Sequence, residues 1–104
     1  MNFAEFERLP EPPFGRYELR RGEPVIVAPP KLKHSNVQRR LRRLLEAVAG
    51  ETSIIHTEFG FKALPELEYR IADVVLISQA RWERADLNGY FAGAPELAVE
   101  ILSP

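Results

Sequence analysis

Residues 93–104 read GAPELAVEILSP, and residues 71–77 read IADVVLI. Both contain a short apolar run typical of a buried β-strand, and each run carries one carboxylate, Glu100 in the first and Asp73 in the second. Burying an isolated carboxylate is costly, and the usual solutions are a metal ion, a cationic partner or a raised pKa. Two such strands in one small domain therefore predict a shared cation site.

The composition is that of one globular domain. The chain has 104 residues, 45% of them hydrophobic, which suits a single domain with its own core. No apolar run approaches the roughly 20 residues that a membrane span needs, and the first residues lack the pattern of a secretory signal. The absence of cysteine excludes disulfides, thiolate metal sites and cysteine nucleophiles. We expect a cytoplasmic protein with no membrane partner.

The charges balance overall but not locally. With 14 Lys and Arg against 15 Asp and Glu, the whole molecule has no general attraction for nucleic acid. One stretch is nevertheless strongly basic and contains Lys31, Lys33, Arg39, Arg40, Arg42 and Arg43. Such a stretch can bind a phosphate backbone, with an affinity that falls steeply with salt. The alternative interpretation is a solvated helix face.

The pattern of apolar and turn residues predicts an α/β domain with a central mixed sheet. Residues 1–13 end in a proline-rich sequence and are expected to form an extended arm. Residues 17–19 and 24–27 predict a β-hairpin that turns at Gly22. Further strands are expected at residues 53–63 (one strand, or two with a bend at Gly60), 69–77 and 97–102, with a short helical turn at residues 79–86.

The clearest helix follows Pro29 and Pro30. Ser35 and Gln38 form a capping-box pattern at its start, and Gly50 is well placed to end it. One face repeats apolar residues at helical spacing: Val37, Leu41, Leu44, Leu45 and Val48. We expect this stripe to pack on the sheet, with the arginines outward. Replacing Leu41 or Leu44 by Ala should then cost about 2 to 5 kcal/mol.

These features occur in a distinctive order: YEL at residues 17–19 with Gly22, then Pro29-Pro30, His34, the amphipathic helix, DVV at residues 73–75, and GAPELAVEILSP. From about Gly15 onward, the chain resembles the Uma-type restriction-endonuclease-like proteins of bacteria, which belong to the PD-(D/E)XK nuclease superfamily. The resemblance implies a restriction-endonuclease-like α/β fold over residues 1–104. Its parts would be a central mixed sheet, an N-terminal hairpin and a flanking helix.

The resemblance also implies a metal-dependent DNA endonuclease that forms homodimers. Asp73 matches the metal-binding aspartate of the family, and Glu100 matches its second acidic ligand. Hard oxygen ligands of this kind suit magnesium or manganese. Such an ion would polarise the scissile phosphate and lower the pKa of an attacking water. The basic stretch from Lys31 to Arg43 would face the DNA.

The chain departs from the standard motif at Leu102, which stands two residues beyond Glu100, where a lysine is usual. Similar proteins often carry a lysine on a helix after Ser-Pro instead. We expect the C-terminal part of the fold, with that helix, its lysine and the closing strands, to be absent from residues 1–104. The alternative function is therefore a catalytically inactive module that binds nucleic acid, regulates or dimerises.

Three of the candidate site residues have two interpretations each. Glu18 is a possible third carboxylate at the site, or a solvated hairpin residue. His34 is a possible contact to phosphate or metal, or a structural residue at the helix start. Asp73 itself could cap a turn or pair with an arginine such as Arg70. His56 and Trp82 are assigned to structure.

Overall fold

The structure is a computed structural model and describes residues 1–102. Ser103 and Pro104, which complete the C-terminal motif, lie outside the described residues. The elements in chain order are α1 (Phe3–Glu7), β1 (Arg16–Arg20), β2 (Glu23–Val27), α2 (Leu32–Ala49), the 3-10 turn η1 (Gly50–Thr52), β3 (Ser53–Leu64), β4 (Glu68–Ser78), α3 (Gln79–Arg84), β5 (Phe91–Ala92) and β6 (Leu97–Val99). None of the helices within residues 1–102 has the length and apolar character needed to cross a membrane.

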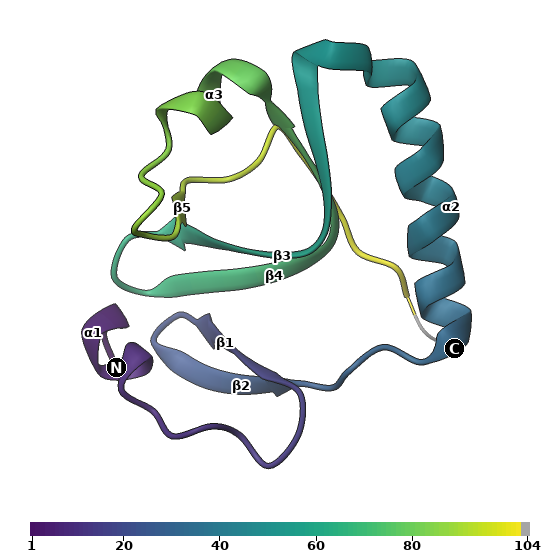
Figure 1. Ribbon diagram of the computed structural model, residues 1–104. Helices are drawn as coiled ribbons and strands as arrows, with labels where there is room; N and C mark the ends of the chain where they lie inside the picture. The colour runs from purple at the N-terminus through teal and green to yellow at the C-terminus, as the bar shows by residue number, and fades with distance from the viewer. Residues whose placement is uncertain (103–104) are drawn as a thin grey trace.

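The sheet is built around β4, in the order β2-β1-β4-β3-β5. The pairing of β3 with β5 is parallel and the other pairings are antiparallel, so the sheet is mixed, as the sequence predicts. β6 also pairs with β4, and the yellow segment that contains it runs back toward the start of α2 (Figure 1). Because β3 occupies one edge of β4, β1 and β6 share its other edge.

The core lies along β4. Val74, Val75 and Ile77 are 0% exposed, which confirms that this run is covered on both faces. Phe61 and Trp82 pack in the same cluster. A Cβ atom at Gly60 would clash with the hydroxyl end of Tyr69, so a larger residue there would have to displace that side chain.

The N-terminal region differs from its prediction. Instead of an extended arm, residues 3–7 form α1, which is capped by Asn2 and Glu5 in a reciprocal capping box. The helix buries Phe3 against the rings of Tyr69 and Tyr90. The prolines that favour extended backbone begin only at Pro10, so they do not prevent this short helix. The β-hairpin of β1 and β2 is confirmed, with positive φ at Arg21 (49°) and Gly22 (79°).

The start of α2 also differs from its prediction. The N-cap is Lys31, which makes no side-chain cap, and the expected box of Ser35 and Gln38 does not form. Gln38 is instead buried and binds β4. The stop at Gly50 is confirmed, with φ 64° and an N–H bonded to the Glu46 carbonyl.

Only two of the five residues of the apolar stripe of α2 pack on the sheet. Leu41 and Leu45 are partly buried, whereas Val37, Leu44 and Val48 are 44%, 65% and 85% exposed. The expected packing of Leu44 is therefore wrong, because the sheet covers a narrower face of the helix than the apolar spacing suggests. The arginines do face outward, as predicted.

Two strands differ in detail from the expectation. β3 is one strand, and its positive φ lies at Glu58 (48°) and not at Gly60. β6 ends at Val99, so Glu100 directly follows the strand instead of lying within it. The short helix around Trp82 is confirmed as α3.

Candidate active site

The pairing of β4 with β6 brings Asp73 and Glu100 together. In this antiparallel register Val74 is opposite Val99 and Val75 is opposite Ala98. Asp73 and Glu100 are the next pair of the same register, just past the end of β6. Residues directly opposite in such a pairing have their Cβ atoms about 4.5 to 5.5 Å apart. The topology therefore places two carboxylates side by side although they are 27 positions apart in the sequence.

Asp73 is held by three contacts. His34 Nε2 lies 3.0 Å from Asp73 Oδ1, and the backbone N–H of Ile101 donates to Oδ2 at 2.6 Å. The side chain of Gln38 donates to the main-chain carbonyl of Asp73 at 3.1 Å. The alternative pairing with Arg70 is wrong, since Arg70 binds Glu68 at 2.6 Å. Residues three apart on a strand point to opposite faces.

Glu100 is an exposed residue, although its carboxyl group is partly desolvated. None of the ion pairs found among residues 1–102 includes it. Burial, followed by the negative charges of Asp73 and Glu18, raises the pKa of Glu100, while Arg20 opposes this shift. Asp73, Glu18 and Glu100 thus lie within electrostatic reach of one another.

Glu18 is buried and not solvated, in contrast to the expectation for a hairpin glutamate. Its Oε2 accepts the backbone N–H of Ile71 at 2.7 Å, and its Oε1 accepts Arg20 Nε at 2.8 Å. Glu18 thereby joins β1 to β4 two residues before Asp73. Arg20 is a cleft residue that the sequence did not single out, although its spacing from Glu18 places both on one face of a strand.

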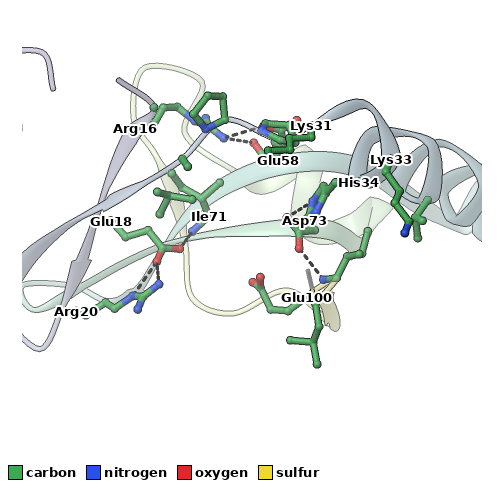
Figure 2. A pocket seen from close by; sticks show the side chains of 18 residues that line it. Arg16, Glu18, Arg20, Lys31, Lys33, His34, Glu58, Ile71, Asp73 and Glu100 are labelled. Carbon is green, nitrogen blue, oxygen red and sulfur yellow. Dashed lines mark hydrogen bonds and ion pairs between the residues drawn. The ribbon is translucent and has the colours of Figure 1, made fainter. Parts of the chain in front are cut away.

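These groups line a cleft of about 810 Å³ between the hairpin, α2 and the segment after β6. Figure 2 shows Glu18 and Arg20 on one side of Asp73 and Glu100, with His34 on the other. Lys31 and Lys33 also line the cleft. The third lysine, Lys62, lies elsewhere, 4.1 Å from the centre of the Phe3 ring. The four helix arginines are exposed on α2 and are not part of the cleft lining: Arg39, Arg40, Arg42 and Arg43.

The comparison with protein families decides the identity. Residues 3–104 match the family Uma2, which is described as "Putative restriction endonuclease". The chain belongs to the Uma2 family. A search of curated proteins gave no match.

A solved structure supports the fold of this Uma2-family chain. It is the crystal structure of "a putative nuclease belonging to DUF820" from Anabaena variabilis ATCC 29413, with 23% sequence identity and a TM-score of 0.78. The match covers 100% of the present chain and 59% of the Anabaena chain, so the chain spans 59% of the length of that protein. The α/β, restriction-endonuclease-like fold with a central mixed sheet is thereby confirmed.

The acidic residues of the Uma2-family chain fit a hard divalent cation. Within residues 1–102, no group of three or more His, Cys, Asp or Glu side chains is arranged to hold a metal ion. Magnesium, however, is commonly bound by one or two carboxylates, with water and substrate phosphate completing its shell. Each oxygen of Asp73 accepts one contact and retains a second lone pair. Asp73 and Glu100 are therefore a chemically suitable ligand pair.

Proposed function

We propose that this Uma2-family chain forms a metal-dependent nuclease domain that hydrolyses phosphodiester bonds of DNA, with Asp73 and Glu100 as the ligands of magnesium or manganese. The observation that carries the proposal is the register of β4 and β6, which places the two carboxylates in neighbouring positions at a cleft. Desolvation and, after it, the negative charges of Asp73 and Glu18 raise the pKa of Glu100, and a cation bound by the two carboxylates would offset this repulsion.

The residues around the pair have separate roles in this proposal. His34 donates to Asp73 and fixes the direction of its carboxylate. Gln38 fixes the backbone of β4 at the same residue. Glu18 holds β1 against β4. A bound divalent ion would polarise the scissile phosphate and lower the pKa of a water molecule.

Basic residues extend from the cleft along α2 and offer binding sites for the phosphates of DNA. Lys31 and Lys33 line the cleft at the start of the helix. The exposed arginines continue along α2 from there: Arg39, Arg40, Arg42 and Arg43. Binding through such contacts is independent of base sequence and weakens as salt rises. We propose that α2 lies along the DNA backbone.

Leu102 favours a second candidate function. It occupies the position where the standard motif has a lysine. A chain without that lysine could bind metal and DNA and yet not cleave, which is the binding-module alternative. Lys31 and Lys33 are the lysines within residues 1–102 that line the cleft.

We also propose that the chain acts in the cytoplasm as a homodimer. Leu44 and Val48 of α2 and Leu97 of β6 are large apolar side chains that remain exposed, and such surface favours association. Sedimentation equilibrium over a range of concentrations tests the dimer. A single monomeric mass throughout would contradict it.

The proposed activity is tested by incubating supercoiled DNA with the chain in magnesium, in manganese and in EDTA. We expect nicking in the presence of either metal and none in EDTA. Asp73→Asn and Glu100→Gln should abolish nicking, while Glu83→Gln, on the exposed side of α3, should retain it. Binding of DNA without nicking would favour the inactive module. Nicking that survives both substitutions would contradict the proposed site.

A further inference from the structure

Strand β1 presents charged side chains to the cleft at alternate positions. Arg16, Glu18 and Arg20 are two residues apart, so they share one face of the strand. All three line the cleft that contains Asp73 and Glu100. Arg20 thus lies among the carboxylates of the proposed metal site.

The guanidinium of Arg20 is fixed in orientation. Its Nε and Nη2 atoms lie 2.8 Å and 2.6 Å from Glu18 Oε1. Glu18 is itself buried and held by the backbone N–H of Ile71. A long side chain that is anchored in this way loses less entropy when it binds a second partner.

Arg20 retains donors for a ligand in the cleft. A guanidinium has five N–H donors, and the contacts with Glu18 engage one edge of the group. The side chain of Arg20 is 48% exposed, while that of Glu18 is only 5% exposed. The paired edge is therefore buried and the remaining donors are accessible.

The other cations of the cleft are placed differently. Arg16, at the opposite end of β1 from Arg20 in Figure 2, donates to the main-chain carbonyl of Glu58 at 3.0 Å. His34 is bound to Asp73. Arg20 lines the same cleft as Asp73 and Glu100. Arg20 is thus an anchored cation in the cleft that contains the carboxylate pair.

We propose that Arg20 contacts a non-bridging oxygen of a nucleic-acid phosphate next to Asp73 and Glu100. The inference rests on the proposed function, because it names a residue that would hold the phosphate at that site. A planar guanidinium matches the oxygens of a phosphate and binds them through charge-assisted hydrogen bonds. A cation at this place also offsets the repulsion between the phosphate and the carboxylates.

The test measures binding without cleavage. The affinity of the full chain for a short fluorescent DNA duplex is followed by anisotropy in EDTA over a range of salt concentrations. Arg20→Gln should weaken binding for every duplex sequence and reduce the slope of log affinity against log salt by about 1, as expected for the loss of one phosphate contact. Arg20→Lys should retain most of the slope. Arg84→Gln, on the exposed face of α3, is the matched control and should leave the slope unchanged.

A purely structural Arg20 would change the melting temperature and leave the salt slope as it is, and this result would overturn the inference while the proposed function stands. Absence of any DNA binding by the unsubstituted chain would overturn the proposed function as well. Because Arg20→Gln leaves Glu18 as a buried charge with one partner fewer, the comparison is repeated in a Glu18→Gln background. In that background, the double variant Glu18→Gln with Arg20→Gln should have a slope of log affinity against log salt that is smaller by about 1 than the slope of Glu18→Gln alone.

Discussion

The backbone N–H of Ile101 donates a 2.6 Å hydrogen bond to Oδ2 of Asp73, so the segment after β6 is fastened to the middle of β4. The other carboxylate oxygen of Asp73 faces His34 on α2. One side chain thus joins three parts of the chain and also sets the position of Glu100, the residue before Ile101. A substitution at Asp73 that tests its chemistry must therefore preserve its shape, and Asn does so.

His34 is expected to support metal binding through Asp73. His34→Ala removes the donor to Oδ1, and loss of such a partner typically lowers metal affinity about 10- to 100-fold. Calorimetric titration with manganese measures the change. His56→Ala is the control, since the His56 ring is bonded to the carbonyl of Thr57, outside the cleft. Equal manganese affinities of the unsubstituted chain and of His34→Ala would contradict this role.

Gln38 should contribute to stability far more than a surface glutamine. Gln38 is buried, and Gln38→Ala deprives the partly buried main-chain carbonyl of Asp73 of its donor; a loss of this kind costs about 1 to 3 kcal/mol. Gln79→Ala, which removes an exposed contact to Glu83, should stay within about 0.5 kcal/mol. Urea unfolding of both variants checks the difference, and equal effects would contradict the packing described for α2.

Ile77 in the core and Leu44 on α2 have side chains of equal size but very different exposure. Ile77 is 0% exposed, so Ile77→Ala should cost about 2 to 5 kcal/mol. Leu44 is 65% exposed in the single chain, so at concentrations where the chain is monomeric Leu44→Ala should change the free energy of unfolding by no more than about 0.5 kcal/mol. The measurement is denaturant unfolding. A large loss for Leu44→Ala would show that this face of α2 is covered in solution.

Glu96 should make stability depend on pH. Its hydrogen bond with Arg81, followed by that with the Ser78 N–H, holds the pKa of Glu96 below its ordinary value of 4.5. A lowered folded-state pKa stabilises the fold above the ordinary value, and this stabilisation is lost as pH falls through the folded-state pKa. Glu96→Gln should therefore melt earlier than the parent near neutral pH, and the gap should close in acid. A gap of the same size at every pH would contradict this account.

Sequence reasoning succeeded where the signal is local. The apolar run at residues 74–77 predicts a buried strand from its composition alone. Gly22 and Gly50 predict a turn and a helix end, because glycine readily adopts a positive φ. It failed where a residue's partner is distant. Gln38 resembles part of a capping box, but its partner is the carbonyl of Asp73, 35 residues away.

The same limit applied to the site. The two carboxylates could be singled out because charge within an apolar strand is costly. The burial of Glu18 and the involvement of Arg20 depend on the packing of β1 beside β4, which no single segment specifies. The exposure of three of the five residues in the α2 stripe likewise depends on how much of the helix the sheet covers.

The central claim is that Asp73 and Glu100 together hold a divalent ion, and calorimetric titration with manganese tests it most directly. The unsubstituted chain should bind the ion, and Asp73→Asn and Glu100→Gln should each weaken binding at least about tenfold, with unchanged circular dichroism. Glu83→Gln on α3 serves as the control and should bind as the parent does. An unsubstituted chain that binds no manganese, or variants that bind it with the parent's affinity, would contradict the claim.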